Sequence, residues 1–528
     1  MVGVPGRSKG CNTCIQRKVK CDQGKPTCGN CAKAKRICGG YQRKTGWVFS
    51  SDVELPVREA NALTANANSV ICHGRWTNKQ SKQSKSRHGQ RQSSSLSPKE
   101  EELGTGMSHY TFVIDDSATP SPLSSPSPIQ AISNLSAQWE QLRNAFIGMY
   151  LPDTLFISSR RVDGVTGNWL TELKGESIAS KALETAVAAC ASVQVGQDKG
   201  DMMLISQGRE IYQASLQHMR AALANSELRS TDATLAACMA LSLYELFANR
   251  MGDDCMYEAH AKGAMALLQM RGPDSLQSPL AHSIFLGLRR QIVLNCLVKH
   301  EVMFINKGAW TAKPWGKYKK NSVDRCLDAL YMLPPIQIML DDARRETEPT
   351  KIRQLCLEVV SNCWKVDAFL QQWYEEVEKA HVGPMYWPVF SSTRGDHGKP
   401  NIFSTVFEFS HFSISYQLTT YWSGLYVTHE VLKKANEILA GLDPFQADEF
   451  NAAVKRSEET WMRHSRYVCQ SHEFFMKREN GRAGLLVGLA MLKGCYYNFM
   501  DYPELCAEEL AWVRFRIEEN NRRLSMPL

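Results

Sequence analysis

The chain has 528 residues, of which 43% are hydrophobic and 22% are charged. At about 100–200 residues per domain, this length allows several domains and at least one buried core, and the composition excludes a collagen-like or wholly disordered chain. The formal net charge of +8 is unevenly distributed: residues 1–50 carry +10, residues 51–99 carry +5, and the remainder carries −7. A basic N-terminal segment joined to a mildly acidic body indicates that the N-terminal segment binds a polyanion.

No apolar run in the sequence is long enough to cross a membrane. The longest, 483–492, stops at Lys493, whereas a membrane-spanning helix needs about 18 or more such residues. Arg7 and Lys9 are not followed by an apolar stretch, so we predict no secretory signal. We therefore expect a protein of the cytosol or nucleus with no membrane partner, where the reducing environment keeps thiols free of disulfides.

Six of the 17 cysteines lie within the first 38 residues, and the other eleven are scattered singly. A scattered free cysteine behaves as a small apolar side chain and is often buried. We predict that these eleven are core residues: Cys72, Cys190, Cys238, Cys255, Cys296, Cys326, Cys356, Cys363, Cys469, Cys495 and Cys506.

Composition divides the chain into three regions. Residues 1–45 are rich in cysteine and base but poor in aliphatic side chains, so they need a source of folding energy other than an apolar core, and bound metal is the candidate. Residues 46–135 are polar, basic and Ser/Pro-rich, which is typical of a disordered linker. Residues 136–528 show recurrent helical periodicity and few strand-like alternations, so we predict an all-α domain.

The helical pattern recurs in several segments of this third region. In 255–270, apolar and small residues recur three and four positions apart, and Gly272-Pro273 supplies a stop signal. The other predicted helical segments are 176–194, 203–224, 231–249, 279–304, 350–377, 404–437, 447–477, 483–498 and 503–524.

The early cysteines form a duplicated Cys-x2-Cys-x6-Cys array, namely Cys11, Cys14, Cys21, Cys28, Cys31 and Cys38. Zinc takes four ligands in a tetrahedron, at about 2.3 Å from each cysteine sulfur. Six thiolates cannot give each of two separate ions four ligands, so two thiolates must bridge. The repeat makes Cys11 and Cys28 equivalent, and we predict that they bridge two Zn²⁺ ions. The predicted ligand sets are Cys11, Cys14, Cys21 and Cys28 for one ion, and Cys28, Cys31, Cys38 and Cys11 for the other.

This array and the bases within it resemble the fungal binuclear zinc cluster, Zn2Cys6, of sequence-specific transcription factors. The resemblance is carried by Gly10-Cys11-Asn-Thr-Cys14, by Arg17-Lys18-Val-Lys20-Cys21-Asp22, and by Lys25-Pro26-Thr-Cys28-Gly-Asn-Cys31 with Arg36-Ile-Cys38. Two other interpretations of the array are a pair of independent zinc ribbons and an unmetallated reactive tract.

The six residues between Cys14 and Cys21 are the predicted base-reading segment. In a metal-clamped module this short helix and its end can enter the major groove, where guanine offers the O6 and N7 acceptors that Arg and Lys prefer. Lys18 is the first candidate for a base contact and Arg17 the second, and the resemblance implies that the target is a CGG triplet. The remaining candidates are predicted to contact phosphates: Lys9, Lys20, Lys25, Arg43 and Lys44. For each of these residues, the alternative to a DNA contact is a charged side chain that is only solvated.

Two features bear on the conformation of the cluster and on the oligomeric state in which the chain binds DNA. Pro26 lies between the two halves, and the resemblance implies that this position can carry a cis bond, although only about one X-Pro bond in twenty is cis by default. Many relatives dimerise through a coiled coil just after the cluster, but here the heptad pattern is limited to a short stretch, 60–70, where three or four heptads would be needed. We expect the chain to bind as a monomer or to form a homodimer through its helical body.

The helical region resembles the regulatory region found downstream of such clusters. The resemblance lies in His260-Ala-Lys-Gly-Ala264, in Leu267-Leu268 and in Arg271-Gly272-Pro273, although a helix packed through its small residues explains the same pattern. The tryptophans and methionines of this region could line an effector pocket, but core packing is the simpler prediction. The tryptophans concerned are Trp139, Trp169, Trp364, Trp373, Trp387, Trp422 and Trp461.

The sequence contains no phosphate-binding Gly-rich loop and no Gly-x-Ser-x-Gly elbow. His429-Glu430 and His472-Glu473 begin like a zinc-protease helix, but neither is completed by a second histidine. We therefore predict a non-enzyme.

These features predict a nuclear, zinc-dependent, sequence-specific DNA-binding regulator of RNA polymerase II transcription. Double-stranded DNA is the predicted partner, and transcriptional co-regulators are further candidates. Two alternatives stay open: the helical body is a small-molecule receptor or an enzyme that the cluster delivers to chromatin, or the cluster is a protein-docking zinc module.

Overall fold

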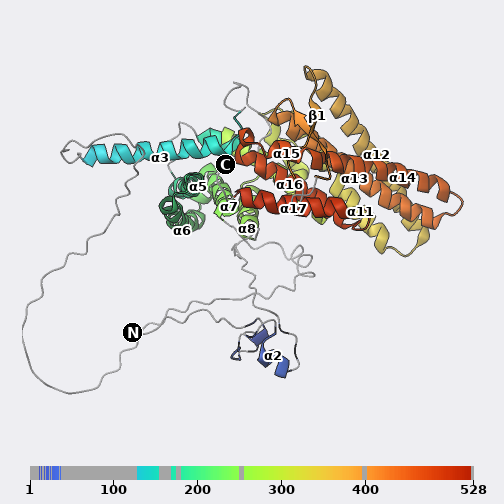
Figure 1. Cartoon of the computed structure of the whole chain (residues 1–528), viewed down its shortest axis with the longest axis horizontal. Helices are drawn as coiled ribbons and strands as arrows, with labels where there is room; N and C mark the ends of the chain where they lie inside the picture. The colour runs from blue at the N-terminus through green and yellow to red at the C-terminus, as the bar shows by residue number, and fades with distance from the viewer. Residues whose placement is uncertain are drawn as a thin grey trace, which may run out of the picture. The chain divides into compact units, whose positions relative to one another are not determined.

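The computed structural model describes residues 11–38 in part, 128–153, 168–173, 180–248, 255–394 and 401–524. Within the first range, the described residues are 11, 13–14, 17, 19–22, 24, 27–34, 36 and 38. The chain forms two compact units, Met1–Ser127 and Pro128–Leu528. Figure 1 shows the short helix α2 (Gly29–Lys33) in the first unit and the helices of the second. Most of the predicted linker, 46–135, lies outside the described residues, and its last part, from Pro128, begins helix α3.

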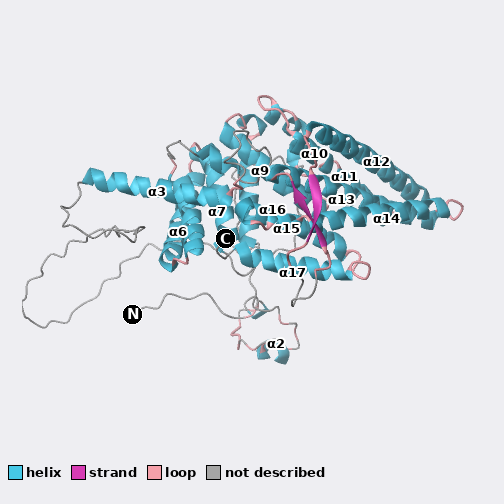
Figure 2. Cartoon of the chain, turned by 45° about the horizontal axis from the view of Figure 1, so that its top comes forward, coloured by secondary structure: helices cyan, strands magenta, loops and turns pink. Residues whose placement is uncertain are grey.

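The second unit is mostly helical, which confirms the predicted fold class (Figure 2). Its first α-helices are α3 (Pro128–Tyr150), α5 (Lys181–Lys199), α6 (Met202–Ala224), α7 (Asp232–Ala248), α8 (Cys255–Arg271) and α9 (Pro279–Lys299). The later ones are α10 (Ser322–Leu330), α11 (Leu333–Arg345), α12 (Pro349–Ala380), α13 (Phe412–Leu442), α14 (Ala447–Gln470), α15 (His472–Phe475), α16 (Gly481–Met500) and α17 (Ala507–Leu524). Among the described helices, none is both long and apolar enough to span a membrane.

Short 3-10 turns connect several of these helices. They are η2 (Asn168–Leu173), η3 (Leu228–Ser230), η4 (Pro273–Ser275), η5 (Phe304–Asn306), η6 (Gly308–Thr311), η7 (Lys313–Trp315) and η9 (Arg478–Asn480). Helices α3, α10 and α11 lie outside the predicted helical segments, and in α11 two prolines follow the first residue. They are tolerated because the N–H groups of the first turn have no intrahelical partner.

Helix α8 ends where the sequence predicts. Gly272 adopts φ +75°, and its N–H donates to the Leu268 carbonyl oxygen at 3.1 Å. Earlier in the helix, a Cβ on Gly263 would lie 3.3 Å from the Cys238 Sγ, and Ala264 is fully buried. The small residues of this motif therefore serve the packing of α8 against α7.

The predicted helix over 404–437 is wrong at its start. Strand β2 (Thr405–Phe409) precedes α13 and pairs antiparallel with β1 (Tyr386–Phe390), with Pro388 opposite Phe407. The β2 sequence Thr-Val-Phe-Glu-Phe is rich in the β-branched and aromatic residues that favour strands, and helical periodicity in the following residues obscured that signal. Helix α13 then begins after His411, whose Nδ1 accepts from the Ile414 N–H at 3.3 Å.

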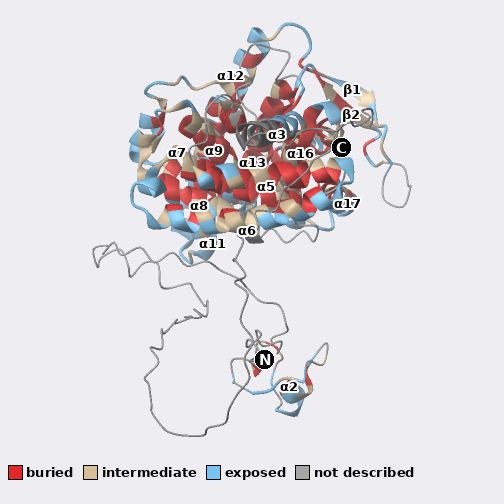
Figure 3. Cartoon of the chain, turned by 90° about the vertical axis from the view of Figure 1, so that its left-hand side faces the viewer, coloured by how far each residue is buried: buried red, intermediate tan, exposed pale blue. Residues whose placement is uncertain are grey.

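The core of the second unit surrounds α13, whose residues are buried along most of its length (Figure 3). Its Trp422 packs edge-on against Tyr386 and Tyr467 and at a tilt against Phe407. The scattered cysteines are buried as predicted wherever their side chains are described; Cys72 and the Cys255 side chain lie outside the described residues. Four of the seven tryptophans are also core residues: Trp169, Trp373, Trp422 and Trp461. The core prediction is wrong for the other three, which are exposed: Trp139, Trp364 and Trp387.

The C-terminal end of α3 packs directly on Gly481. A Cβ at this glycine would lie 2.7 Å from the Tyr150 carbonyl oxygen and 2.9 Å from that of Leu151. Gly481 also has φ +58°, a conformation that L side chains rarely adopt. Next to this contact, the Asp153 N–H donates to the Glu479 carbonyl oxygen at 2.8 Å. The first helix of the unit is thus joined to the start of α16 by backbone contact.

We predict that Gly481→Ala destabilises the second unit by about 2 kcal/mol or more, because both the backbone conformation and the close approach disfavour a Cβ. Chemical denaturation of the full chain would measure the free energy of unfolding. Gly148→Ala is the matched control, because a Cβ there meets nothing within 4 Å and a helical alanine is favoured over glycine. Equal stability of the two variants would contradict the proposed contact.

Candidate metal centre and nucleic-acid interface

The two halves of the cysteine array have the same local backbone. In the first half, the Cys14 N–H donates to the Cys11 Sγ at 3.4 Å; in the second, the Cys31 N–H donates to the Cys28 Sγ at 3.3 Å. In each half the chain then turns in the same way. The Val19 N–H donates a hydrogen bond to the Cys14 carbonyl oxygen, and the Arg36 N–H donates one to the Cys31 carbonyl oxygen, both at 3.0 Å. The duplicated sequence therefore folds as a structural repeat.

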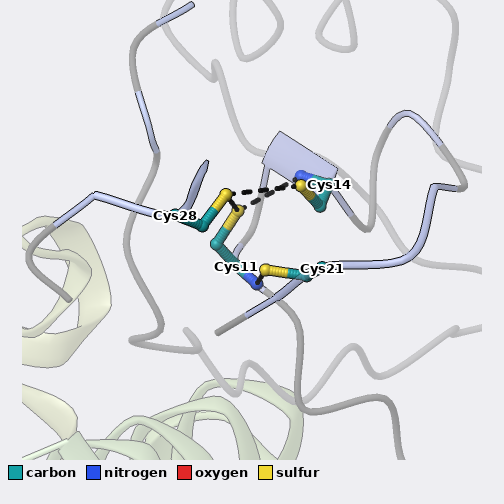
Figure 4. A group of neighbouring side chains, drawn as sticks. All are labelled: Cys11, Cys14, Cys21 and Cys28. Carbon is teal, nitrogen blue, oxygen red and sulfur yellow. Dashed lines mark hydrogen bonds between the residues drawn. The ribbon is translucent and has the colours of Figure 1, made fainter. Parts of the chain in front are cut away.

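The six sulfur atoms form two groups of four, each suited to one metal ion. One group is Cys11, Cys14, Cys21 and Cys28, and the other is Cys11, Cys28, Cys31 and Cys38. Cys11 and Cys28 occur in both. The Sγ atoms of Cys11 and Cys28 lie 3.6 Å apart, as do those of Cys14 and Cys28 (Figure 4). A tetrahedron with Zn–S bonds of about 2.3 Å has S···S edges of about 3.8 Å, so these spacings fit zinc.

Burial of the sulfurs disfavours free thiolates at this centre. Cys11, Cys14, Cys28 and Cys31 are all fully buried. Burial raises the pKa of the Cys11 thiol to about 12 and raises the pKa of Cys14 and Cys28 as well. Because zinc binds thiolates, the positive charge of the ion must compensate for the buried negative charge, and metal binding must release protons.

Asp22 joins the two halves, a role that the sequence reasoning missed. Its carboxylate accepts from the Gly29 N–H at 2.8 Å and from the Asn30 N–H at 3.5 Å, at the N-terminus of α2. The Gly29 hydrogen bond is the main reason why the pKa of Asp22 is lowered. The Asn30 side-chain amide in turn donates to the Lys20 carbonyl oxygen. One sequence signal was available: Asp22 is the only acidic residue among the first fifty.

Two of the predicted DNA contacts can be placed in the structure. Arg17 and Lys20 are exposed on the segment between Cys14 and Cys21, with the exposed Val19 between them. The second half presents the exposed bases Lys33 and Arg36, which the sequence reasoning did not propose. The other candidates lie outside the described residues, as does Pro26: Lys9, Lys18, Lys25, Arg43 and Lys44.

Comparison with known families covers both units. Residues 9–48 match the fungal Zn(2)-Cys(6) binuclear cluster domain, and residues 128–303 match the fungal specific transcription factor domain. The second match spans helices α3 to α9. The chain therefore carries a Zn2Cys6 domain at its N-terminus, and its early cysteines stand in metal-binding geometry.

Several curated proteins are similar to this chain. White-opaque regulator 2 of Candida albicans is 58% identical over 56 residues, which are 11% of each protein. Pestheic acid cluster transcriptional regulator 3 of Pestalotiopsis fici is 27% identical over 342 residues, covering 56% of each. Arginine metabolism regulation protein II of Saccharomyces cerevisiae is 51% identical over 45 residues, which are 8% of this chain and 5% of that protein. The chain thus matches about half the length of one of these relatives and much less of the others. No solved structure matches it.

Both family matches and the relatives named above are those of fungal transcription regulators, and this chain is similar to them in its Zn2Cys6 domain and in part of its helical unit. The Zn2Cys6 match implies that the N-terminal domain binds zinc and DNA.

We predict that Asp22→Ala accelerates zinc release from the cluster several-fold, because the N-terminus of α2 loses its acceptor. Zinc transfer to a chromogenic chelator would measure the rate. Asp22→Asn retains an oxygen acceptor and should stay close to the parent chain. If the alanine variant released zinc at the parent rate, the link between the two halves would be unimportant for holding the metal.

Proposed function

We propose that this chain is a nuclear, sequence-specific DNA-binding regulator of RNA polymerase II transcription that depends on two zinc ions. The observation that supports this most strongly is that two four-sulfur groups share Cys11 and Cys28. The same small unit also exposes basic side chains. Such a unit combines a rigid metal core with positive charge on its surface, which is what binding of a DNA backbone requires.

The zinc ions would have a structural role. One would be held by Cys11, Cys14, Cys21 and Cys28, and the other by Cys28, Cys31, Cys38 and Cys11. With all ligands supplied by the chain, neither ion keeps an open coordination position for a substrate. Six thiolates and two Zn²⁺ leave a net charge of −2, which the surrounding bases offset.

The segment between Cys14 and Cys21 would enter the major groove. Lys18, with Arg17 beside it, would donate to guanine O6 and N7 in a CGG triplet. Lys20 and the four remaining basic residues would contact phosphates and set the register of the module on DNA. These four are Lys9, Lys25, Arg43 and Lys44. The exposure of Arg17 and Lys20 on this segment supports the assignment.

The helical body would supply the regulatory contacts with co-regulators, without a catalytic site. Each candidate catalytic pair of the body instead has partners within the fold. The His429 Nε2 lies 3.1 Å from Asp367 Oδ1, and Glu473 accepts from the Ser391 hydroxyl at 2.8 Å and from the Ser392 N–H at 2.7 Å. These contacts support a structural role for both motifs.

We predict that Cys28→Ser lowers bound zinc to less than one ion per chain, because it removes a ligand from both ions and metal binding is coupled to folding. Cys38→Ser is the comparison, because Cys38 belongs to only one four-sulfur group and its loss should spare the other ion more. Elemental analysis of the purified full chains gives the stoichiometry. Two zinc ions retained in Cys28→Ser would contradict the bridging assignment.

We predict different effects of two lysine substitutions on DNA binding. Lys18→Ala should reduce the preference for CGG over mutated triplets, by about 1–3 kcal/mol per lost base contact, with zinc content unchanged. Lys44→Ala should weaken binding to all sequences alike and reduce the salt slope by about one. Titrations on matched duplexes at several salt concentrations separate the two. Loss of affinity without loss of preference in both variants would contradict the assignment of Lys18 to a base.

A further inference from the structure

Five lysines lie close together in the sequence of the helical unit, between helices α9 and α10. Residues 307–320, which include the turns η6 and η7, contain these lysines and no acidic residue, although residues 100–528 together carry a net charge of −7. We call residues 307–320 the lysine segment. A concentrated positive charge on an otherwise acidic unit favours contact with a polyanion at this place. The five lysines are Lys307, Lys313, Lys317, Lys319 and Lys320.

The aromatic side chains that alternate with these lysines attach the segment to the helical unit. The Tyr318 ring stacks on His282 of α9, with the ring centroids 3.9 Å apart, and the Trp315 ring packs edge-on against the same histidine at 5.5 Å. The Trp310 ring packs edge-on against Phe304 of η5 at 4.8 Å. The fold therefore uses these rings as anchors, and they hold the backbone that carries the lysines in a defined conformation.

Three lysines of the segment have no carboxylate partner among the described residues. Lys313 is in an ion pair with Asp274, whose Oδ2 lies 2.6 Å from the lysine Nζ. Lys320 is in an ion pair with Asp328, at 2.7 Å between the corresponding atoms. The three other lysines are exposed, so their charges are available to an external anion. They are Lys307, Lys317 and Lys319.

The exposed surface of the lysine segment is basic without being apolar. An acidic peptide that binds as an amphipathic helix needs an apolar groove beside the positive charge, and acidic or phosphorylated motifs are commonly held by arginine clusters. The segment has no arginine, and its exposed residues other than lysine are small. Lysines among small side chains suit the sugar–phosphate backbone of a nucleic acid, which presents charge without apolar side chains. The small exposed residues are Gly308, Ala309, Thr311, Ala312 and Gly316.

We propose that the lysine segment is a second DNA-binding surface, which contacts phosphates of the same duplex that the cluster binds. This inference rests on the proposed function, because it takes duplex DNA as the ligand of the chain. Phosphate contacts fix position and carry no sequence information directly, so this surface adds affinity without adding base preference. Because one chain joins the two surfaces, binding through the cluster raises the effective concentration of DNA at the lysine segment, and a weak contact there is sufficient.

The charge of the rest of the helical unit would orient it on the duplex. Residues 100–528 are acidic overall in spite of the five lysines, so DNA phosphates repel most of this region and attract the lysine segment. The same contact makes the affinity of the full chain for DNA more dependent on salt, because each phosphate that a lysine neutralises releases condensed counterions.

Titration of the zinc-loaded full chain with a duplex at several salt concentrations tests the proposal. The variant combines Lys307→Gln, Lys317→Gln and Lys319→Gln, which remove three exposed charges that have no carboxylate partner. We expect the slope of log affinity against log salt to become shallower by about 0.9 for each lost phosphate contact, which is about two to three for the triple variant. At low salt, the affinity should fall about tenfold or more, equally for duplexes with and without a CGG triplet.

A matched control removes the same charge elsewhere on the helical unit. Lys181→Gln, Lys365→Gln and Lys455→Gln combined change three exposed lysines of α5, α12 and α14 that likewise contact no carboxylate among the described residues. This control should keep the parent salt slope, and so should the lysine-segment variant in which the same three positions are arginine. Equal slopes for the glutamine variant of the lysine segment and for the control would overturn the proposal.

Two further readouts separate this proposal from its neighbours. The preference for CGG over mutated triplets reports on the cluster, so a parent chain without preference would contradict the proposed function, whereas the change in salt slope would still support the second surface. Binding of poly-glutamate reports on an acidic protein partner. If the glutamine variant lost binding to poly-glutamate but kept the parent salt slope on DNA, the lysine segment would serve an acidic protein, and the proposal would be overturned.

Discussion

The first unit depends on the attraction between buried thiolates and a metal cation. The buried side chains that its described residues contribute are Cys11, Cys14, Cys28 and Cys31, so its interior consists of sulfur rather than of aliphatic groups. Desolvation raises the pKa of Cys11, Cys14 and Cys28 and so favours their protonated thiols. Two zinc ions shared through Cys11 and Cys28 would stabilise the buried thiolates, and the free energy of metal binding would fold the unit. The same ions would fix the segment that carries Arg17 and Lys20. Recognition of DNA would thus rest on the same interaction as the fold.

The helical unit is stabilised differently, by an apolar core around α13 and by a few buried polar contacts that join distant segments. Arg482 at the start of α16 is fully buried and donates to the Arg523 carbonyl oxygen near the end of α17; burial lowers its pKa to about 10. Nearer the surface, Glu473 accepts hydrogen bonds from Ser391 and Ser392, the residues that follow β1. A buried group such as Arg482 must be paired because an unsatisfied buried donor is costly. These contacts join segments of the helical unit that lie far apart in the sequence.

The sequence predicts those parts of the structure whose physical signal is local. Cysteine spacing indicates the metal centre, because the Cys-x2-Cys pairs and the repeat restrict which sulfurs can meet. Helical periodicity and stop signals predict α8 and its end at Gly272. Strand β2 was missed because the helical periodicity of the residues that follow it obscured its own strand-favouring sequence. The exposure of Trp364 could not be predicted, since the spacing of apolar residues on α12 is the same on a buried and on an exposed side. The link from Asp22 to α2 depends on how the two halves fold together, and only the structure shows it.

Selection from a random duplex library by the zinc-loaded full chain, with zinc counted on the same sample, tests the central claim most directly. The account predicts two zinc ions per chain and enrichment of sequences that contain CGG triplets. Two bound zinc ions without any enriched sequence would contradict it, because the cluster would then be folded and metal-bound yet unable to read DNA.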